Sequence, residues 1–128
     1  MSSIHQEISF NAAPAKIYEA LTQPSAFGAL TGAPADIGTK VGDAFSLFGG
    51  MISGRHLEMA PGKRLVQAWR ADNWAEGVYS VVRFELAAQG TGTRLSFDHT
   101  GFPAEMKAEL EGGWQKMYWE KMSAWLAN

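Results

Sequence analysis

Apolar and polar residues alternate from Ile4 to Phe10, and a period of two is typical of a strand with one buried face. A helical pattern follows this strand. Pro14 suits the first helical position, because its missing N–H would be unpaired there, and we expect Asn11 to cap the helix. A second short helix is expected to end at Gly32. The amino-terminal part therefore predicts one strand followed by two short helices.

Short apolar runs then recur between glycine-containing breaks up to residue 100. They cover residues 44–48, 51–59, 64–70, 78–87 and 93–99. Connections this short join antiparallel neighbours, since parallel strands require a crossover of a dozen or more residues. We therefore expect an antiparallel sheet in sequence order, with the amino-terminal strand at an edge or a closing position.

The last part of the chain has the period of an amphipathic helix. Its apolar positions recur at spacings of three and four, and they are Met106, Leu110, Trp114, Met117, Tyr118, Met122 and Trp125. The pair Gly112 and Gly113 costs about 2 kcal/mol of helix propensity relative to two alanines. The pair therefore predicts a bend, a break or a close approach of the helix to the sheet.

The order of these elements, together with residues 12–24, resembles the START-like, helix-grip superfamily. Further segments are similar to the homologues of the activator of the heat-shock protein 90 ATPase. They are residues 41–50, 54–58 with Pro61, 65–70 and 112–114. The resemblance implies a single α+β domain over residues 1–128, in which a curved antiparallel sheet, two short helices and a long carboxy-terminal helix enclose a hydrophobic cavity. It implies no particular reaction, because the superfamily includes lipid carriers, polyketide cyclases and chaperone-binding domains.

Composition narrows the possible partners. The 128 residues fit one domain, and the net charge of −2 without a basic run argues against nucleic acid. The absence of cysteine excludes disulfides and thiolate metal sites. No signal peptide or membrane-spanning run is recognisable, so we expect a cytoplasmic protein without membrane insertion, as a monomer or a homodimer.

Candidate catalytic groups are few. The three histidines lie on separate predicted strands without ligand spacing, so no metal or cofactor is expected. His99 shares the inward face of its strand, where a hydrogen-bonded structural histidine is the preferred interpretation over a functional one. Asp72 and Glu76 fall in a predicted turn and Asp98 on the outer face, so we expect no catalytic residue.

The sequence therefore predicts noncatalytic binding of a small hydrophobic or aromatic molecule between the sheet and the last helix. The expected ligand-binding residues are Phe45, Leu47, Trp69, Ser80, Val82, Phe84, Phe97, His99, Trp114, Met117 and Tyr118. One alternative is a chaperone-interaction module that uses partly exposed Trp119, Trp125 and Leu126. A second is a polyketide cyclase-like enzyme whose polar groups would be His99, Ser80, Gln67 and Tyr118.

Overall fold

The computed structural model describes residues 2–127, which form one curved seven-stranded sheet with helices on its concave side. The strands are β1 (Ser3–Phe10), β2 (Ala35–Ile37), β3 (Ala44–Leu47), β4 (Ile52–Ala60), β5 (Arg64–Ala71), β6 (Ser80–Gln89) and β7 (Gly92–Thr100). Their spatial order is β1-β7-β6-β5-β4-β3-β2, and every pair is antiparallel. The predicted sheet in sequence order is confirmed, and β1 lies at an edge beside β7.

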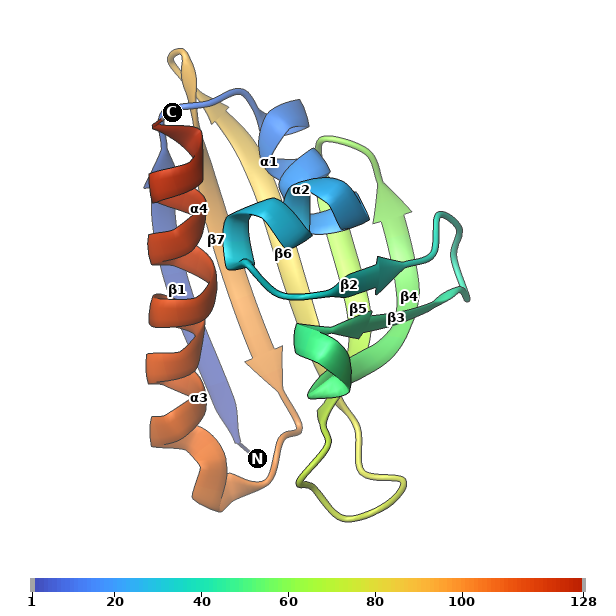
Figure 1. The fold of residues 1–128 in the computed structure, drawn as a ribbon. Helices are drawn as coiled ribbons and strands as arrows, with labels where there is room; N and C mark the ends of the chain where they lie inside the picture. The colour runs from blue at the N-terminus through green and yellow to red at the C-terminus, as the bar shows by residue number, and fades with distance from the viewer. Residues whose placement is uncertain (1, 128) are drawn as a thin grey trace.

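The helices lie before and after the main run of strands (Figure 1). They are α1 (Pro14–Thr22), α2 (Pro24–Thr31), α3 (Lys107–Gly113) and α4 (Glu120–Leu126), with a π-helical segment, Trp114–Trp119, that joins α3 to α4. Short 3₁₀ turns cover Phe48–Gly50 and Ala104–Met106. This arrangement is the α+β helix-grip fold that the sequence predicts.

Two details differ from the sequence-based expectations. The cap position of α1 is Ala13, without a side-chain hydrogen bond, so the prediction that Asn11 caps the helix is wrong. Pro14 occupies the first turn directly, which moves the cap to the residue before it. The three-residue strand β2 was not predicted. By contrast, α2 ends as expected, because Gly32 is left-handed with φ 71°.

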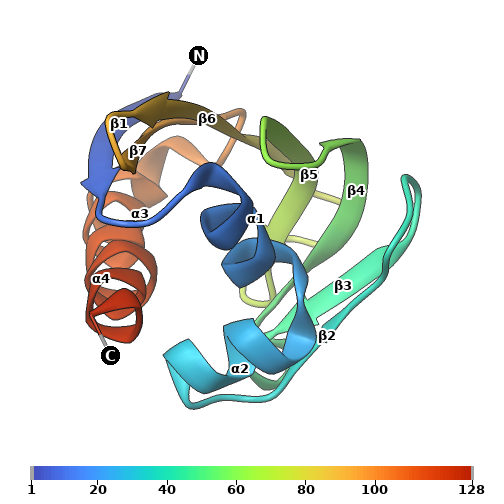
Figure 2. The same ribbon diagram turned by 90° about the horizontal axis from the view of Figure 1, so that it is seen from above.

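The concave side of the sheet carries the core. In Figure 2 the sheet curls around α1 and α2, and the carboxy-terminal helix closes the side next to β1. Contacts of α1 with β6 and β7, of α2 with α4 and of α3 with β1 hold these helices in place. The core side chains alternate along each central strand, as in Leu95, Phe97 and His99 of β7.

Gly54 allows β4 to pass close to its neighbours. A Cβ at this position would lie 1.8 Å from the carbonyl oxygen of Ala68 and 2.7 Å from Cζ of Phe45. No side chain fits at these distances, so this strand position requires glycine. The sheet can then keep its curvature beside Phe45.

Candidate functional site

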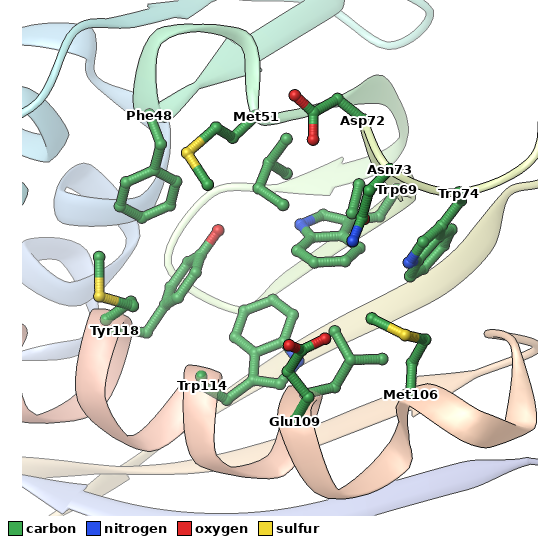
Figure 3. Close-up of a pocket in the computed structure, with 15 residues that line it drawn as sticks. Phe48, Met51, Trp69, Asp72, Asn73, Trp74, Met106, Glu109, Trp114 and Tyr118 are labelled. Atoms are coloured by element: carbon green, nitrogen blue, oxygen red, sulfur yellow. The ribbon is translucent and has the colours of Figure 1, made fainter.

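A pocket of about 340 Å³ lies between the sheet and the carboxy-terminal helix (Figure 3). Strand ends and loops form one wall, and the helix forms the other. The lining residues are Phe48, Met51, Ile52, Trp69, Ala71, Asp72, Asn73, Trp74, Met106, Glu109, Leu110, Gly113, Trp114, Met117 and Tyr118. The pocket opens to solvent beside Met51 and Met117, which are both exposed. It is therefore accessible to small molecules.

Aromatic rings form the inner walls of the pocket. The ring centroid of Trp69, on β5, lies 5.2 Å from that of Trp114 on the helix. Trp114 in turn lies 4.2 Å from Tyr118, and Trp69 lies 5.8 Å from Trp74. Such rings provide large, flat apolar surfaces against which an aromatic ligand can stack.

The π-helical segment decides which helix residues face the core. A π turn accommodates one extra residue, so the buried side chains after Trp114 are displaced by one position. Trp119 is therefore buried, at 2% exposure, whereas Met117 is 40% exposed at the pocket mouth. The expectation that Trp119 is partly exposed is wrong, and its Nε1–H donates to Gln6 Oε1 at 2.6 Å.

The glycine pair lies where the π-helical segment begins. Gly113 has helical angles, φ −63° and ψ −45°, and a Cβ added at Gly112 or Gly113 would meet no atom within 4 Å. The α-helix gives way to the π segment directly after the pair, but neither glycine is needed for a close approach to the sheet. Gly113 lines the pocket, so a side chain there would occupy pocket space.

The rim contains one residue in an unusual conformation. Phe48 has φ 54°, a left-handed value that is uncommon for a bulky residue. Its ring packs edge-on against Phe27, at 5.6 Å, and against Tyr118, at 6.1 Å. These contacts offset the backbone strain, and they hold the Phe48 ring at the edge of the pocket.

Arg70 organises the loop between β5 and β6, which carries Trp74. Its guanidinium donates to the carbonyl oxygens of Trp74 at 2.9 Å, Ala75 at 3.2 Å and Val78 at 3.2 Å. Three such bonds from one charged group fix a segment that lies outside the sheet ladder. The Trp74 wall of the pocket therefore depends on Arg70.

We expect Arg70→Met to lower the free energy of unfolding by about 2 kcal/mol, because hydrogen bonds from a charged donor are lost. Amide exchange of residues 72–78 should accelerate more than exchange in the strands. Arg83→Met is the matched control, since Arg83 forms ion pairs on the exposed outer face, where such pairs contribute about 0–1 kcal/mol. Unchanged exchange in this loop would show that Arg70 does not order it.

His99 lies behind the pocket wall in a chain of hydrogen bonds. Ser80 Oγ–H donates to the carbonyl oxygen of Trp69 at 2.8 Å, so Oγ accepts from Nε2–H of His99 at 2.7 Å. Trp114 Nε1–H donates to Nδ1 of His99 at 3.0 Å. These partners define a neutral histidine protonated on Nε2, and burial lowers its pKa to about 3. The chain ties the helix to β5, β6 and β7.

The pocket brings together part of the predicted ligand-binding set. Trp69, Trp114, Met117 and Tyr118 line it. The other predicted residues are buried in the core outside the lining, and their role in binding stays a prediction: Phe45, Leu47, Ser80, Val82, Phe84, Phe97 and His99. Trp74 and Phe48 also line the pocket and were not predicted from the sequence. An aromatic residue in a loop between strands is a signal that could have indicated Trp74.

The charged lining residues are Asp72 and Glu109, which are exposed at the rim. Asp98 lies on the outer face, where it contacts His5 and Arg83. Among residues 2–127, no group of three or more His, Asp and Glu side chains could hold a metal ion. No helix in the same range is long and apolar enough to cross a membrane.

Comparison with solved structures finds this fold repeatedly. An HSP90 activator from Plasmodium falciparum matches with a TM-score of 0.94 and 24% identity, covering 99% of this chain and 97% of that one. CalU16 from Micromonospora echinospora matches with a TM-score of 0.83 and 22% identity, covering 98% of this chain and 76% of the other. At 22–24% sequence identity, this likeness shows that the fold is shared.

Sequence comparison connects the chain to a family. An activator of 90 kDa heat shock protein ATPase homolog from Dictyostelium discoideum is 32% identical over 84% of this chain and 28% of its own length. Homolog 1 from Homo sapiens is 29% identical over 87% of this chain and 33% of its own length. The chain thus spans about a third of these relatives. Residues 11–127 match the family described as "Activator of Hsp90 ATPase homolog 1-like protein", and the chain belongs to that family.

Proposed function

We propose that this protein binds a small hydrophobic or aromatic molecule, without catalysis, in the pocket between the sheet and the carboxy-terminal helix. The observation that carries the proposal is an open pocket of about 340 Å³ with walls of Trp69, Trp114 and Tyr118. Small-molecule sites are typically concave, largely apolar and of about 300–1,000 Å³. A packed core would leave no space of this size beside the three rings.

The polar groups favour binding over catalysis. His99 and Ser80 satisfy each other in the core, and Gln67 lies beside His56. Of the four polar residues that a cyclase-like enzyme would use, Tyr118 lines the pocket. Burial raises the pKa of its hydroxyl, so Tyr118 is neutral and serves as a hydrogen-bonding group rather than as a base.

Ligand-observed NMR and thermal unfolding with neutral aromatic compounds test this proposal. A ligand at a hundredfold excess over its Kd should stabilise the protein by about 2.7 kcal/mol. Saturation transfer should appear on the ligand signals, and in protein-observed spectra the pocket residues should shift while Trp125, which lies beside Lys16 outside the pocket, should not. If no compound raises the melting temperature or shows saturation transfer, the proposal fails.

The second candidate function is interaction with an Hsp90-type chaperone. The supporting observation is the family, since the Dictyostelium and human relatives are named activators of the 90 kDa heat shock protein ATPase. The neighbour described as an HSP90 activator from Plasmodium falciparum has nearly the same length as this chain. Half-buried Trp125 and Leu126 at the end of α4 are candidate contact residues.

ATPase assays of the chaperone, with and without this protein, test the second candidate. Stimulation should be lost in a Trp125→Ala variant that still folds. Absence of both binding and stimulation at high micromolar concentration would remove this function.

We further propose that the protein is cytoplasmic and is a monomer or a homodimer. A structural neighbour from Colwellia psychrerythraea is an Aha1 dimer. Light scattering distinguishes the two states.

A further inference from the structure

Two buried hydrogen-bond donors in the pocket wall lack partners. The indole nitrogens of Trp69 and Trp74 have no hydrogen-bond acceptor among residues 2–127. The two residues are 3% and 7% exposed, and both line the pocket. A buried donor without an acceptor costs about 1–3 kcal/mol, so native proteins rarely leave one unpaired. Two such donors on adjacent rings of one pocket call for an explanation.

Other indoles of the same helix and sheet are satisfied. Trp114 Nε1–H donates to His99 Nδ1 at 3.0 Å, and Trp119 Nε1–H donates to Gln6 Oε1 at 2.6 Å. The fold therefore provides acceptors for buried indoles where they face the core. Among the buried indoles of residues 2–127, the two unpaired ones belong to the pocket wall, and the Tyr18 hydroxyl, which is also unpaired, lies outside this pocket.

Tyr118 does not satisfy the donor of Trp69. The Trp69 N–H lies near enough to the Tyr118 hydroxyl to oppose the rise of its pKa, yet the pair forms no hydrogen bond of ordinary geometry. In Figure 3 the Trp69 nitrogen and the Tyr118 hydroxyl face each other across the pocket. An oxygen atom beside both groups could accept from the Trp69 N–H and the Tyr118 O–H. The indole nitrogens are shielded from solvent, so the side chains around them must shift before a ligand oxygen can reach them.

The charge of the pocket limits what can carry that oxygen. Its charged lining residues are Asp72 and Glu109, on opposite walls in Figure 3, and no Lys, Arg or His lines it. A ligand carboxylate would lose hydration and meet only like charge. A neutral carbonyl oxygen accepts hydrogen bonds without that penalty.

Building on the proposed function, we propose that the ligand is a neutral, flat aromatic compound with a carbonyl-type oxygen, which accepts a hydrogen bond from the indole N–H of Trp69 beside the Tyr118 hydroxyl. The rings of Trp69 and Trp114 contact its apolar body. The acidic rim disfavours the corresponding carboxylates. The unpaired donor and the acidic rim together define a ligand class, whereas apolar walls alone would accept any apolar molecule of suitable size.

Three probes of similar shape test the assignment: 9-fluorenone, fluorene and fluorene-9-carboxylate. We expect 9-fluorenone to bind about fivefold more tightly than fluorene, the ratio that one net hydrogen bond provides. Fluorene-9-carboxylate should bind more weakly than either. In ¹H–¹⁵N spectra, 9-fluorenone should move the indole signal of Trp69 downfield. The signals of Trp114 and Trp119 should move less because their N–H groups are already paired.

Substitutions test whether the preference for 9-fluorenone over fluorene depends on the indole N–H groups. Trp69→Phe removes the N–H and keeps an aromatic ring, so the ratio of 9-fluorenone to fluorene affinity should fall toward one. Trp74→Phe should change this ratio less. Trp125→Phe is the matched control outside the pocket, and it should leave the ratio unchanged. If a pocket variant fails to fold, the indole shifts of the wild-type protein still show whether the ligand oxygen bonds to the indole N–H.

The outcomes separate the two proposals. If none of the probes binds, the proposed ligand-binding function is overturned, and the ligand class with it. If fluorene and 9-fluorenone bind equally and the Trp69 indole signal does not move downfield, the pocket binds ligands but the assignment of the hydrogen bond is wrong. Equal or tighter binding of the carboxylate would overturn the requirement for a neutral ligand.

Discussion

Gly113→Leu should lower the affinity for aromatic ligands about thirtyfold while the protein remains folded. Gly113 lines the pocket, and a Cβ there meets no atom within 4 Å, so we expect the leucine side chain to extend into the pocket space. A bound ligand would then overlap this side chain. Forcing extra atoms into an occupied space costs about 1–3 kcal/mol, which corresponds to a loss of this size in affinity.

Gly112→Leu is the matched control. Gly112 is also helical with open space around its Cβ, but it is exposed and outside the pocket lining. Both substitutions should stabilise the helix by about 0.5–1 kcal/mol, because glycine is a poor helix former. Calorimetric titration of the pair should show weakened binding for Gly113→Leu alone. Equal affinities would place the ligand elsewhere.

Acid should destabilise the protein through His99. Burial lowers the pKa of this histidine from 6.5 to about 3, so between these values the unfolded chain binds a proton that the fold does not. The resulting stability is fully present above pH 6.5 and is lost as the pH falls toward 3. At about 1.4 kcal/mol per pH unit, the loss amounts to about 5 kcal/mol. Burial lowers the pKa of His56 as well, which acts in the same direction.

Protonation of His99 would also break its bond with Trp114, because Nδ1 would become a donor facing another donor. Denaturant unfolding between pH 4 and 7 measures the effect. His99→Gln should flatten the slope of stability against pH by up to one proton. His5→Gln is the control. Hydrogen bonds to Glu7 and Asp98 raise the pKa of exposed His5, so the contribution of this histidine to stability falls, rather than rises, with increasing pH. The explanation fails if His99→Gln leaves the slope unchanged.

The sheet could be predicted because its signals are local. Alternation marks each long strand, and short connections require antiparallel neighbours in sequence order. Left-handed Gly32 similarly marks the end of α2. The strand β2 was missed because three residues, Ala35–Ile37, are too short to show a period, and it exists only through its pairing with β3.

The site was predicted in part for a related reason. Trp69, Trp114 and Tyr118 follow from strand and helix periods, which place them on inward faces. Trp74 has no period, because Arg70 positions its loop through backbone carbonyls. Trp119 is buried and Met117 is exposed because of the π-helical segment, and a pattern of 3.6 residues per turn cannot predict such a segment.

The most direct test of the ligand pocket is a crystal structure of the protein grown with 9-fluorenone. We predict electron density for the three-ring system in the pocket, against the rings of Trp69 and Trp114, with the carbonyl oxygen toward the indole nitrogen of Trp69. Crystals of Gly113→Leu under the same conditions should lack this density. An empty wild-type pocket at saturating compound, or density only outside the pocket, would contradict the account.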